Sequence, residues 1–328
     1  EEERRPPAQT REVAIRVNVT DVDDADYAAA EEGRRVVDKT DDEIDQEEHA
    51  KLTETIKNKA QIYNDEEEKA IRVGHEFFEK CREKCKDKKN FEELKSPDEK
   101  VEMKIMQIDG HSAGVATTVV GASVEVCAAY EFQDTYSRER IRTNEERGVT
   151  EHYTKRKNDH TIDYFTTRNL HVRGLASRTA RFKMTWKRLE GGKVIIDASD
   201  TDDLKDEFPL REGNVLVTGH SVWVFEPLAP VGGVPQTAAT FTTNVDAGGI
   251  LHNAIVDSLT DATHKAMTEF LSGVSTLRKK FEKSGGVFKS DEELDQEERN
   301  RIADVIKNQP QEYSADEERV IRTGKEFY

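Results

Sequence analysis

The sequence predicts an α+β fold in which a curved antiparallel β-sheet wraps around a long C-terminal α-helix, with further helices at the N-terminus. Three observations predict it. Alternating apolar residues, separated by turn signals, fill residues 149–245. Helical periodicity then runs over residues 250–283. Because such a helix would be about 45 Å long, it is the only predicted element large enough to lie across a sheet of this size.

The chain opens with a polar segment, residues 1–40, which we assign to no domain. Two helices are predicted after it. The first follows Thr40, with Glu43 three residues later, which is the capping-box pattern. The second begins at residues 64–67 with a similar signal and carries an apolar side. Both helices precede the predicted sheet.

These two helices recur in the sequence. Residues 41–78 align without a gap to residues 291–328, and DDEIDQEE in the first copy corresponds to DEELDQEE in the second. A repeat whose period is as long as a domain predicts a tandem array of whole domains. We therefore place one domain at residues 41–290, with its core at 67–283, and the opening helices of a second, truncated repeat at 291–328.

The middle of the chain is predicted to be mainly β. Strands are expected at residues 101–109, 114–120, 149–156, 161–168, 179–188, 193–199, 215–225 and 237–245. A short helix is expected at residues 122–132, followed by a charged connection. A polar loop at 200–212 and a Pro/Gly-rich turn at 227–235 separate the last strands.

The predicted C-terminal helix carries apolar residues three or four positions apart, which places them along one stripe. The stripe comprises Ile255, Leu259, Ala262, Ala266, Phe270, Val274, Leu277 and Phe281. Four basic residues follow late in the helix: Arg278, Lys279, Lys280 and Lys283. We interpret them as a solvated helix end that complements the helix dipole.

Composition excludes several classes of protein. The 328 residues carry a net charge of −17, so nucleic acid is not an expected partner. No apolar run is long enough to cross a membrane, and the chain does not open with a signal peptide. The three cysteines are too few for a disulfide framework. We expect an intracellular protein of the cytoplasm with peripheral membrane contact, and a fragment of a longer chain because the sequence lacks an initiator methionine.

Motifs for catalysis or metal binding are not evident. The sequence lacks the dinucleotide, Walker, zinc-protease and nucleophile-elbow patterns. Cys81 and Cys85 could supply half of a metal site, but no matching pair is found. The acidic loop at 200–212 lacks the spacing of a calcium loop. We predict no catalytic residues, no metal and no cofactor.

Four stretches carry a resemblance to a known family. They are a strand led by Arg178 that runs through a glycine hairpin (RFKMTWKRLEGGKVIIDAS), the strand VWVFEPL, the turn with Asp246, Gly248 and Gly249, and a helix that ends in Leu277 and Arg278. In order and spacing, residues 67–283 resemble the START (StAR-related lipid-transfer) domain of the Bet v 1-like helix-grip superfamily.

The resemblance implies a tunnel between sheet and helix that holds one lipid (a sterol, a phospholipid or another apolar molecule), with the loop at 200–212 as a lid. Strand parity and the helix stripe then suggest the lining: Phe165, Phe182, Met184, Trp186, Ala239, Phe241, Val245, Ile255, Leu259, Ala262 and Ala266. Sterol-binding relatives bury an acid and an arginine in the tunnel. Phe165 and Met184 occupy those places here, which predicts a more apolar tunnel.

Two other functions stay open. The unit could be a structural or regulatory protein-interaction module of a tandem array, with a core filled by side chains. It could also be an enzyme of the same superfamily, which would require polar groups that converge inside the cavity. The sequence does not decide the identity of the lipid, the number of repeats or the oligomeric state.

Overall fold

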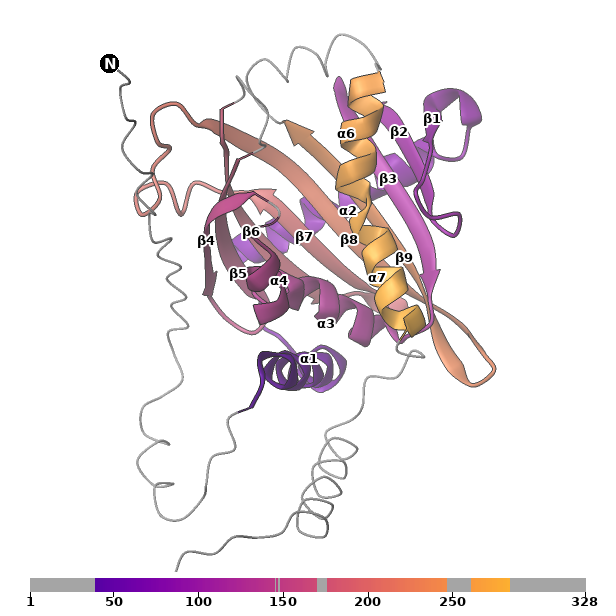
Figure 1. Cartoon of the computed structure of the whole chain (residues 1–328). Helices are drawn as coiled ribbons and strands as arrows, with labels where there is room; N and C mark the ends of the chain where they lie inside the picture. The colour runs from indigo at the N-terminus through magenta and orange to yellow at the C-terminus, as the bar shows by residue number, and fades with distance from the viewer. Residues whose placement is uncertain (1–38, 145, 147, 170–175, 247–260, 284–328) are drawn as a thin grey trace, which may run out of the picture. The chain divides into compact units, whose positions relative to one another are not determined.

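The computed structural model describes residues 39–144, 146, 148–169, 176–246 and 261–283 (Figure 1). All of them belong to one compact unit, Glu1–Val287, and a second unit comprises Phe288–Tyr328. The polar N-terminal segment, the first turns of the predicted C-terminal helix and the second repeat therefore lie outside the described residues.

A nine-stranded sheet forms the centre of the fold, in the order β1-β2-β3-β9-β8-β7-β6-β5-β4. The strands are β1 (Phe91–Leu94), β2 (Glu102–Ile108), β3 (His111–Val120), β4 (Val149–Arg156), β5 (Thr161–Arg168), β6 (Arg178–Arg188), β7 (Val194–Asp200), β8 (Val215–Val231) and β9 (Val234–Asp246). All neighbours in this order are antiparallel, and β6 and β8 add a short parallel pairing. The predicted α+β class, a curved antiparallel sheet with helices, is confirmed.

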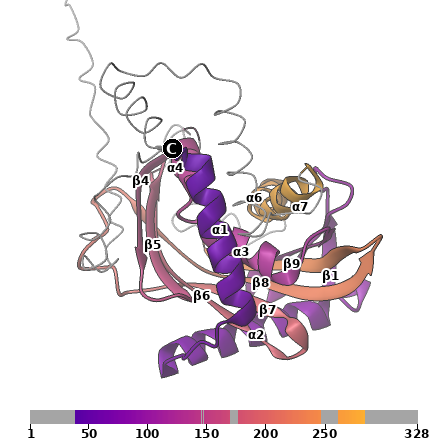
Figure 2. The ribbon, with the colours of Figure 1, turned by 90° about the horizontal axis from the view of Figure 1, so that it is seen from below.

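Helices cover both faces of the sheet, as the view from below shows (Figure 2). The described helices are α1 (Asp41–Asn58), α2 (Asp65–Lys84), α3 (Val124–Asp134), α4 (Arg138–Asn144), α6 (Asp261–Leu271) and α7 (Gly273–Lys283). The sheet curls toward α3, α6 and α7, so we call that side the concave face, and α2 packs on the opposite, convex face. The capping boxes predicted for the first two helices are confirmed at Thr40 and Asn64.

The convex face is closed by α2. Ile71, Phe77, Phe78 and Cys81 of this helix pack in one buried cluster with side chains of β2, β3, β7 and β8. Burial of each large apolar side chain contributes about 1.5–3 kcal/mol. The apolar side of α2 and one face of the strands thus meet in one core, a packing that the sequence does not predict.

The sequence predicts one continuous C-terminal helix, and this prediction is wrong within residues 261–283. There α6 ends at Leu271 and α7 begins at Gly273. Ser272 separates them, and its hydroxyl donates to the carbonyl of Glu269 at 2.7 Å. The buried face of α6 also differs from the predicted stripe. Met267 and Leu271 are buried in α6, whereas Phe270 of the predicted stripe is 45% exposed. After the break, the predicted residues Val274, Leu277 and Phe281 are buried.

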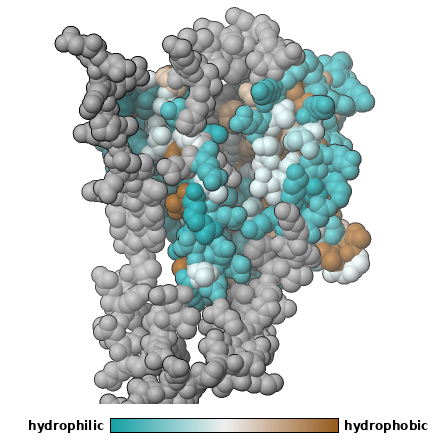
Figure 3. Space-filling view, viewed as in Figure 1, coloured by the Kyte–Doolittle hydropathy of each residue, from teal (hydrophilic) through white to brown (hydrophobic). Residues whose placement is uncertain are grey.

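The Pro/Gly-rich turn predicted at residues 227–235 is mostly a two-stranded ribbon. β8 and β9 run on to a turn at Gly232 and Gly233, which both have positive φ. The ribbon extends past its neighbours, because β7 pairs with β8 only as far as Phe225. Proline is tolerated there since no neighbouring strand needs its N–H. Leu228 and Val231 stay exposed on the ribbon, where Figure 3 shows apolar surface at the lower right.

Two elements escape prediction. The strand β1 forms where the sequence predicts no strand, and α4 lies in the segment that the sequence suggests is a charged connection. Asp45 of α1 explains α4: its carboxylate accepts from the backbone N–H groups of Arg138 and Glu139, both at 3.0 Å. A helix start is therefore capped from a distant part of the chain, which local sequence does not reveal.

Candidate functional site

The pairing register decides which side chains share the concave face. Across the sheet, Trp186 lies opposite Ile196, which lies opposite Trp223, which lies opposite Phe241. Directly opposed residues of neighbouring strands point to the same side of a sheet. The Trp223 ring contacts the Phe241 ring at 4.6 Å between centroids. This row crosses the centre of the concave face.

Five of the eleven residues proposed for the lining lie on this face by register. They are Phe182, Met184 and Trp186 of β6 and Ala239 and Phe241 of β9. Val245 of β9 pairs with Gly219 of β8, and Ala262 belongs to α6. The side chains of Val245 and Ala262 are not among the described parts of the structure. Ile255 and Leu259 lie outside it altogether. Ala266 is described, on α6, and is half-buried.

Phe165 lies on the opposite face from the other β-sheet members of the set. It pairs with Arg181, whereas its neighbour Tyr164 pairs with Phe182. On the convex side its ring stacks on Phe208 at 4.5 Å between centroids. The proposed lid at residues 200–212 thus packs with Phe208 against β4 and β5. Successive side chains of a strand point to opposite faces of the sheet. The pairing register, and not the apolar periodicity, therefore decides which face Phe165 lies on.

The concave face has a filled part and an accessible part. Trp186 and Ala239 are almost completely buried, as are Ile196 and Phe225. By contrast, Tyr164, Phe182, Ala198, Ser221 and Phe241 keep accessible surface although they lie on the same face. The accessible part contains two stacked rings, Tyr164 and Phe182, at 5.8 Å. The side chains of the described residues therefore leave part of the concave face accessible.

Helix α6 lies across one side of this face. Gly114 of β3 allows the close approach, because a Cβ there would lie 2.2 Å from Sδ of Met267. Ala266 and Phe270, one turn apart on α6, keep accessible surface next to this contact. Glu269 of the same helix reaches Arg168 at the end of β5, with 4.0 Å between Oε1 and Nη2. This ion pair joins α6 to a strand on the far side of the concave face.

Two carboxyl groups of α3 form the polar part of the site. Thr135, at the C-cap of α3, donates its hydroxyl to Sδ of Met184 at 3.3 Å, which places that side of the helix against the concave face. Glu131 lies one turn earlier on the same side. Asp134 forms an ion pair with Arg140 of α4, at 3.3 Å. Glu131 is surrounded by protein and still keeps accessible surface.

Burial dominates the ionisation of these acids. It raises the pKa of Glu131 well above the usual range, and the charge of Asp134 raises it further. Burial also raises the pKa of Asp134, although Arg140 opposes this. Both lie in the last turns of α3, where the helix dipole disfavours negative charge. The raised pKa favours the protonated form of Glu131, which is the form that can donate a hydrogen bond.

A histidine and a tyrosine face these acids across the concave side. His152 of β4 pairs with Thr166, and Tyr164 of β5 pairs with Phe182, so both lie on that face. Nδ1 of His152 lies 3.2 Å from Nδ2 of Asn144. Burial lowers the pKa of His152 and raises that of Tyr164. An imidazole, a phenol and a carboxyl group can each form hydrogen bonds with an uncharged polar group.

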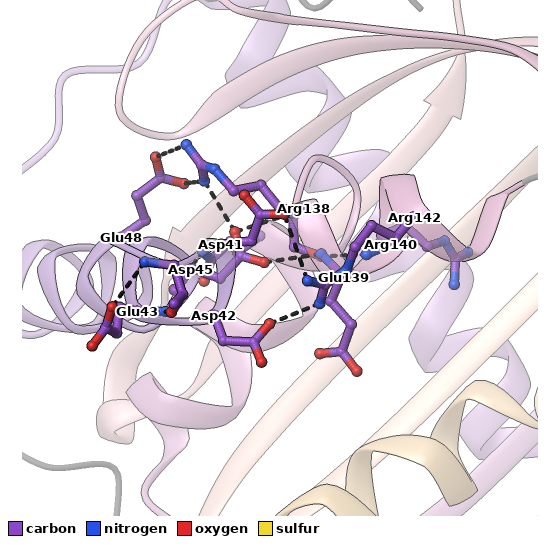
Figure 4. A network of polar contacts seen from close by, with 12 residues as sticks. Asp41, Asp42, Glu43, Asp45, Glu48, Arg138, Glu139, Arg140 and Arg142 are labelled. Atoms are coloured by element: carbon purple, nitrogen blue, oxygen red, sulfur yellow. Dashed lines mark hydrogen bonds and ion pairs between the residues drawn. The ribbon is translucent and has the colours of Figure 1, made fainter. Parts of the chain in front are cut away.

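A network of ion pairs between α1 and α4 holds Arg140 in place (Figure 4). Arg138 donates to Asp45 at 3.0 Å and to Glu48 at 3.2 and 3.3 Å. Arg142 donates to Asp42 at 2.7 Å. Networks of this kind restrain their members more than isolated surface pairs do. The helix that carries the partner of Asp134 is thus fixed from α1.

Sequence reasoning misses these polar groups. It predicts a short helix at residues 122–132 without giving it a role, and it predicts a mainly apolar tunnel. The available signal is the position of Glu131, one turn from Cys127, Ala128 and Thr135 on the side of α3 that is otherwise small or apolar. A carboxyl on such a side is a candidate for a buried, functional acid.

The pH dependence of stability tests the state of Glu131. An acid whose pKa is raised in the folded state stabilises the fold below its unfolded pKa, and that contribution is lost as the pH rises toward the folded value. Glu131→Gln removes this loss. We expect the melting temperature of the variant to exceed that of the wild type at pH 8, and by less at pH 5. The same advantage in Glu125→Gln, at the start of α3, would contradict this assignment.

No group of three or more His, Cys, Asp or Glu side chains in the described residues is placed to hold a metal ion. None of the described helices is long and apolar enough to cross a membrane.

The sheet, with helices laid across its concave face, defines an α+β fold of the helix-grip type. No protein-family model and no curated protein matches the sequence. Among solved structures, the chain is similar to the lipid transfer and protein localization domain of human StarD13 (18% identity, TM-score 0.44, 62% of this chain and 93% of that one). It is also similar to human StAR-related lipid transfer protein 5 (19% identity, TM-score 0.47, 66% and 99%). A StAR-related lipid transfer protein from Xanthomonas axonopodis is similar over 59% and 99% of the two chains (12% identity, TM-score 0.41).

Proposed function

We propose that this domain binds one lipid-like molecule on its concave face, between the sheet and the C-terminal helices, and works without catalysis. The observation that carries the proposal is the accessible surface of side chains that point into the fold. Phe182, Phe241 and Tyr164 are large rings, and such rings are normally buried when they point inward. Their exposure is explained if a ligand covers them. The START resemblance of the sequence points to the same class of ligand.

The polarity of the site suggests what the ligand looks like. Rings of β5, β6, β8 and β9 offer apolar contact, and Glu131, Asp134 and His152 offer hydrogen bonds at one end. Binding pockets of this kind orient an apolar ligand with a few polar groups. We therefore propose a lipid with a small hydroxyl, amide or amine group, and transient membrane contact for its exchange.

A blocking substitution tests this proposal. Ala198 of β7 lies on the concave face between Met184 and Ser221 and is half-buried. We expect Ala198→Trp to fill the space and lower the fraction of chains that carry a co-purified or added lipid by about tenfold, as a clash of 1–3 kcal/mol implies. Native mass spectrometry measures this fraction.

The matched control places the same residue on the convex face. Ala238 of β9 is also half-buried and pairs with Val119, so it lies on the other side of the sheet from Ala239. Ala238→Trp is expected to leave lipid occupancy unchanged. A wild-type chain that carries no lipid and refuses all lipids offered would instead favour an interaction module with a filled core.

A further inference from the structure

The second copy of the repeated segment keeps the residues through which the first copy holds the body of the domain. The body here means residues 91–283, to which α1 and α2 attach. In α1, Asp45 and Glu48 accept hydrogen bonds from Arg138. The corresponding residues, 250 positions later, are Asp295 and Glu298. Both copies therefore contain the two carboxylates that, in the first copy, accept hydrogen bonds from α4.

The buried apolar residues follow the same rule. In α1, Leu52 and Ile56 are buried, and the second copy has isoleucine at both places. In α2 the buried residues are Ile71, Phe77 and Phe78. Their counterparts are Ile302, Ile306, Ile321, Phe327 and Tyr328. His49 is an exception, because Arg299 stands in its place.

The polar contacts of α2 with the sheet are kept as well. Glu66 and Glu68 receive Lys183 and Lys187, at 2.6 and 2.7 Å. Tyr63 donates its hydroxyl to the carbonyl of Trp186 at 2.9 Å. The counterparts of these three residues are Asp316, Glu318 and Tyr313. The buried Glu67, held by His160 and Thr161, has the counterpart Glu317.

Gly74 gives the sharpest evidence. A glycine inside a helix costs about 1 kcal/mol relative to alanine. It is needed in α2 because a Cβ would lie 2.3 Å from Oδ1 of Asp197 on the sheet. The second copy retains a glycine, Gly324. A glycine at this place is what the same close approach to a sheet would require.

Some exposed positions change between the copies, whereas others, such as Gln46, Lys57 and Arg72, are identical. Ile62 is 93% exposed and its counterpart is Glu312. Val73 is 40% exposed and its counterpart is Thr323. Of the buried residues of the first copy that have a counterpart, all except His49 correspond to an identical or similar residue in the second.

We propose that residues 291–328 are a docking element that binds the outer side of a second body of this kind, at the surfaces that α1 and α2 cover here. The partner is identified by its chemistry: an arginine pair matching Arg138 and Arg142, a lysine pair matching Lys183 and Lys187, and a carboxylate matching Asp197 opposite a helical glycine. A second copy of this chain carries all of these groups beneath its own α1 and α2, so the segment would have to take the place of those helices.

Two full-length chains test the proposal. The receptor carries Gly74→Val and Gly324→Val, so that neither of its own segments fits closely. The donor is the wild-type chain labelled with ¹⁵N. A zero-length carbodiimide reagent, which joins an amine to a carboxylate in direct contact, is added to the mixture. We expect mass spectrometry to find Lys187 of the receptor joined to Glu318 of the donor, and the donor to raise the melting temperature of the receptor.

Two donors provide matched controls. Gly324→Val is expected to lower the yield of this cross-link by about tenfold, because overpacking of 1–3 kcal/mol opposes docking. Thr323→Val, at the exposed neighbouring position, is expected to leave it unchanged. The proposal is overturned if the link is absent, if both donor variants give equal yields, or if a receptor that is unfolded alone stays unfolded with a tenfold excess of donor.

Discussion

Arg278→Met is expected to lower the free energy of unfolding by about 3–5 kcal/mol, because it leaves a buried carboxylate without its partner. Nε and Nη2 of Arg278 both donate to Oδ2 of Asp98, at 2.8 and 2.6 Å. The two side chains are only 9% and 4% exposed. Burial opposes the ionisation of Asp98, but the hydrogen bonds from Arg278 lower its pKa overall. Methionine keeps the length of the stem and removes the charge.

Equilibrium unfolding in urea measures this effect. Lys280→Ala, two residues further along α7, removes an exposed contact with Glu139 and is expected to cost less than about 1 kcal/mol. The double variant Asp98→Leu with Arg278→Met removes both charges and is expected to recover most of the loss. If the double variant is as unstable as the single one, the cost arises from packing and not from the unpaired charge.

The same ion pair bears on ligand release. It fastens α7 to the segment before β2, and Arg278 also donates to Glu282 at 2.8 Å. If the concave face holds a lipid, as we propose, a loosened α7 should shorten the time for which the lipid stays bound. The destabilisation by Arg278→Met does not depend on that function.

Most of the fold could be predicted because its strands and helices carry local signals. The hairpin between β6 and β7 has Gly191 and Gly192, both with positive φ, where the sequence predicts a turn. Thr40 and Asn64 carry the helix starts. These signals involve residues close together in the chain, so one sequence suffices to read them.

Features that depend on distant contacts could not be predicted. Arg278 was expected on a solvated helix end, yet Asp98, 180 residues away in sequence, buries it. The facing of Phe165 depends on the register between β5 and β6. In the sequence Glu131 is an ordinary helix residue, and its burial is evident only in the folded structure. In each case the deciding neighbour is far away in the chain.

Glu67→Gln is expected to lower stability by about 3 kcal/mol near pH 7 and by much less near pH 2. Glu67 is 5% exposed, at the start of α2. Burial alone would raise its pKa, but donors from Asn64, Asn158, Thr161 and His160 lower it from 4.5 to about 2. A carboxylate of lowered pKa stabilises the fold above its unfolded pKa, and this contribution is lost as the pH falls through the folded value. The difference between the two pKa values corresponds to about 3 kcal/mol.

The measurement is the free energy of unfolding of both proteins from pH 7 to pH 2. The gap between them should be widest above pH 5 and should close between about pH 4.5 and 2, since only the wild type has this group to protonate. Glu66→Gln, one residue earlier, removes an ion pair of a mostly exposed carboxylate with Lys183 and should cost less than about 1 kcal/mol. A gap for Glu67→Gln that stays constant with pH would show that lost hydrogen-bond geometry, not lost charge, destabilises the variant. Because Glu317 is the counterpart of Glu67, the same titration would be expected wherever the second copy docks.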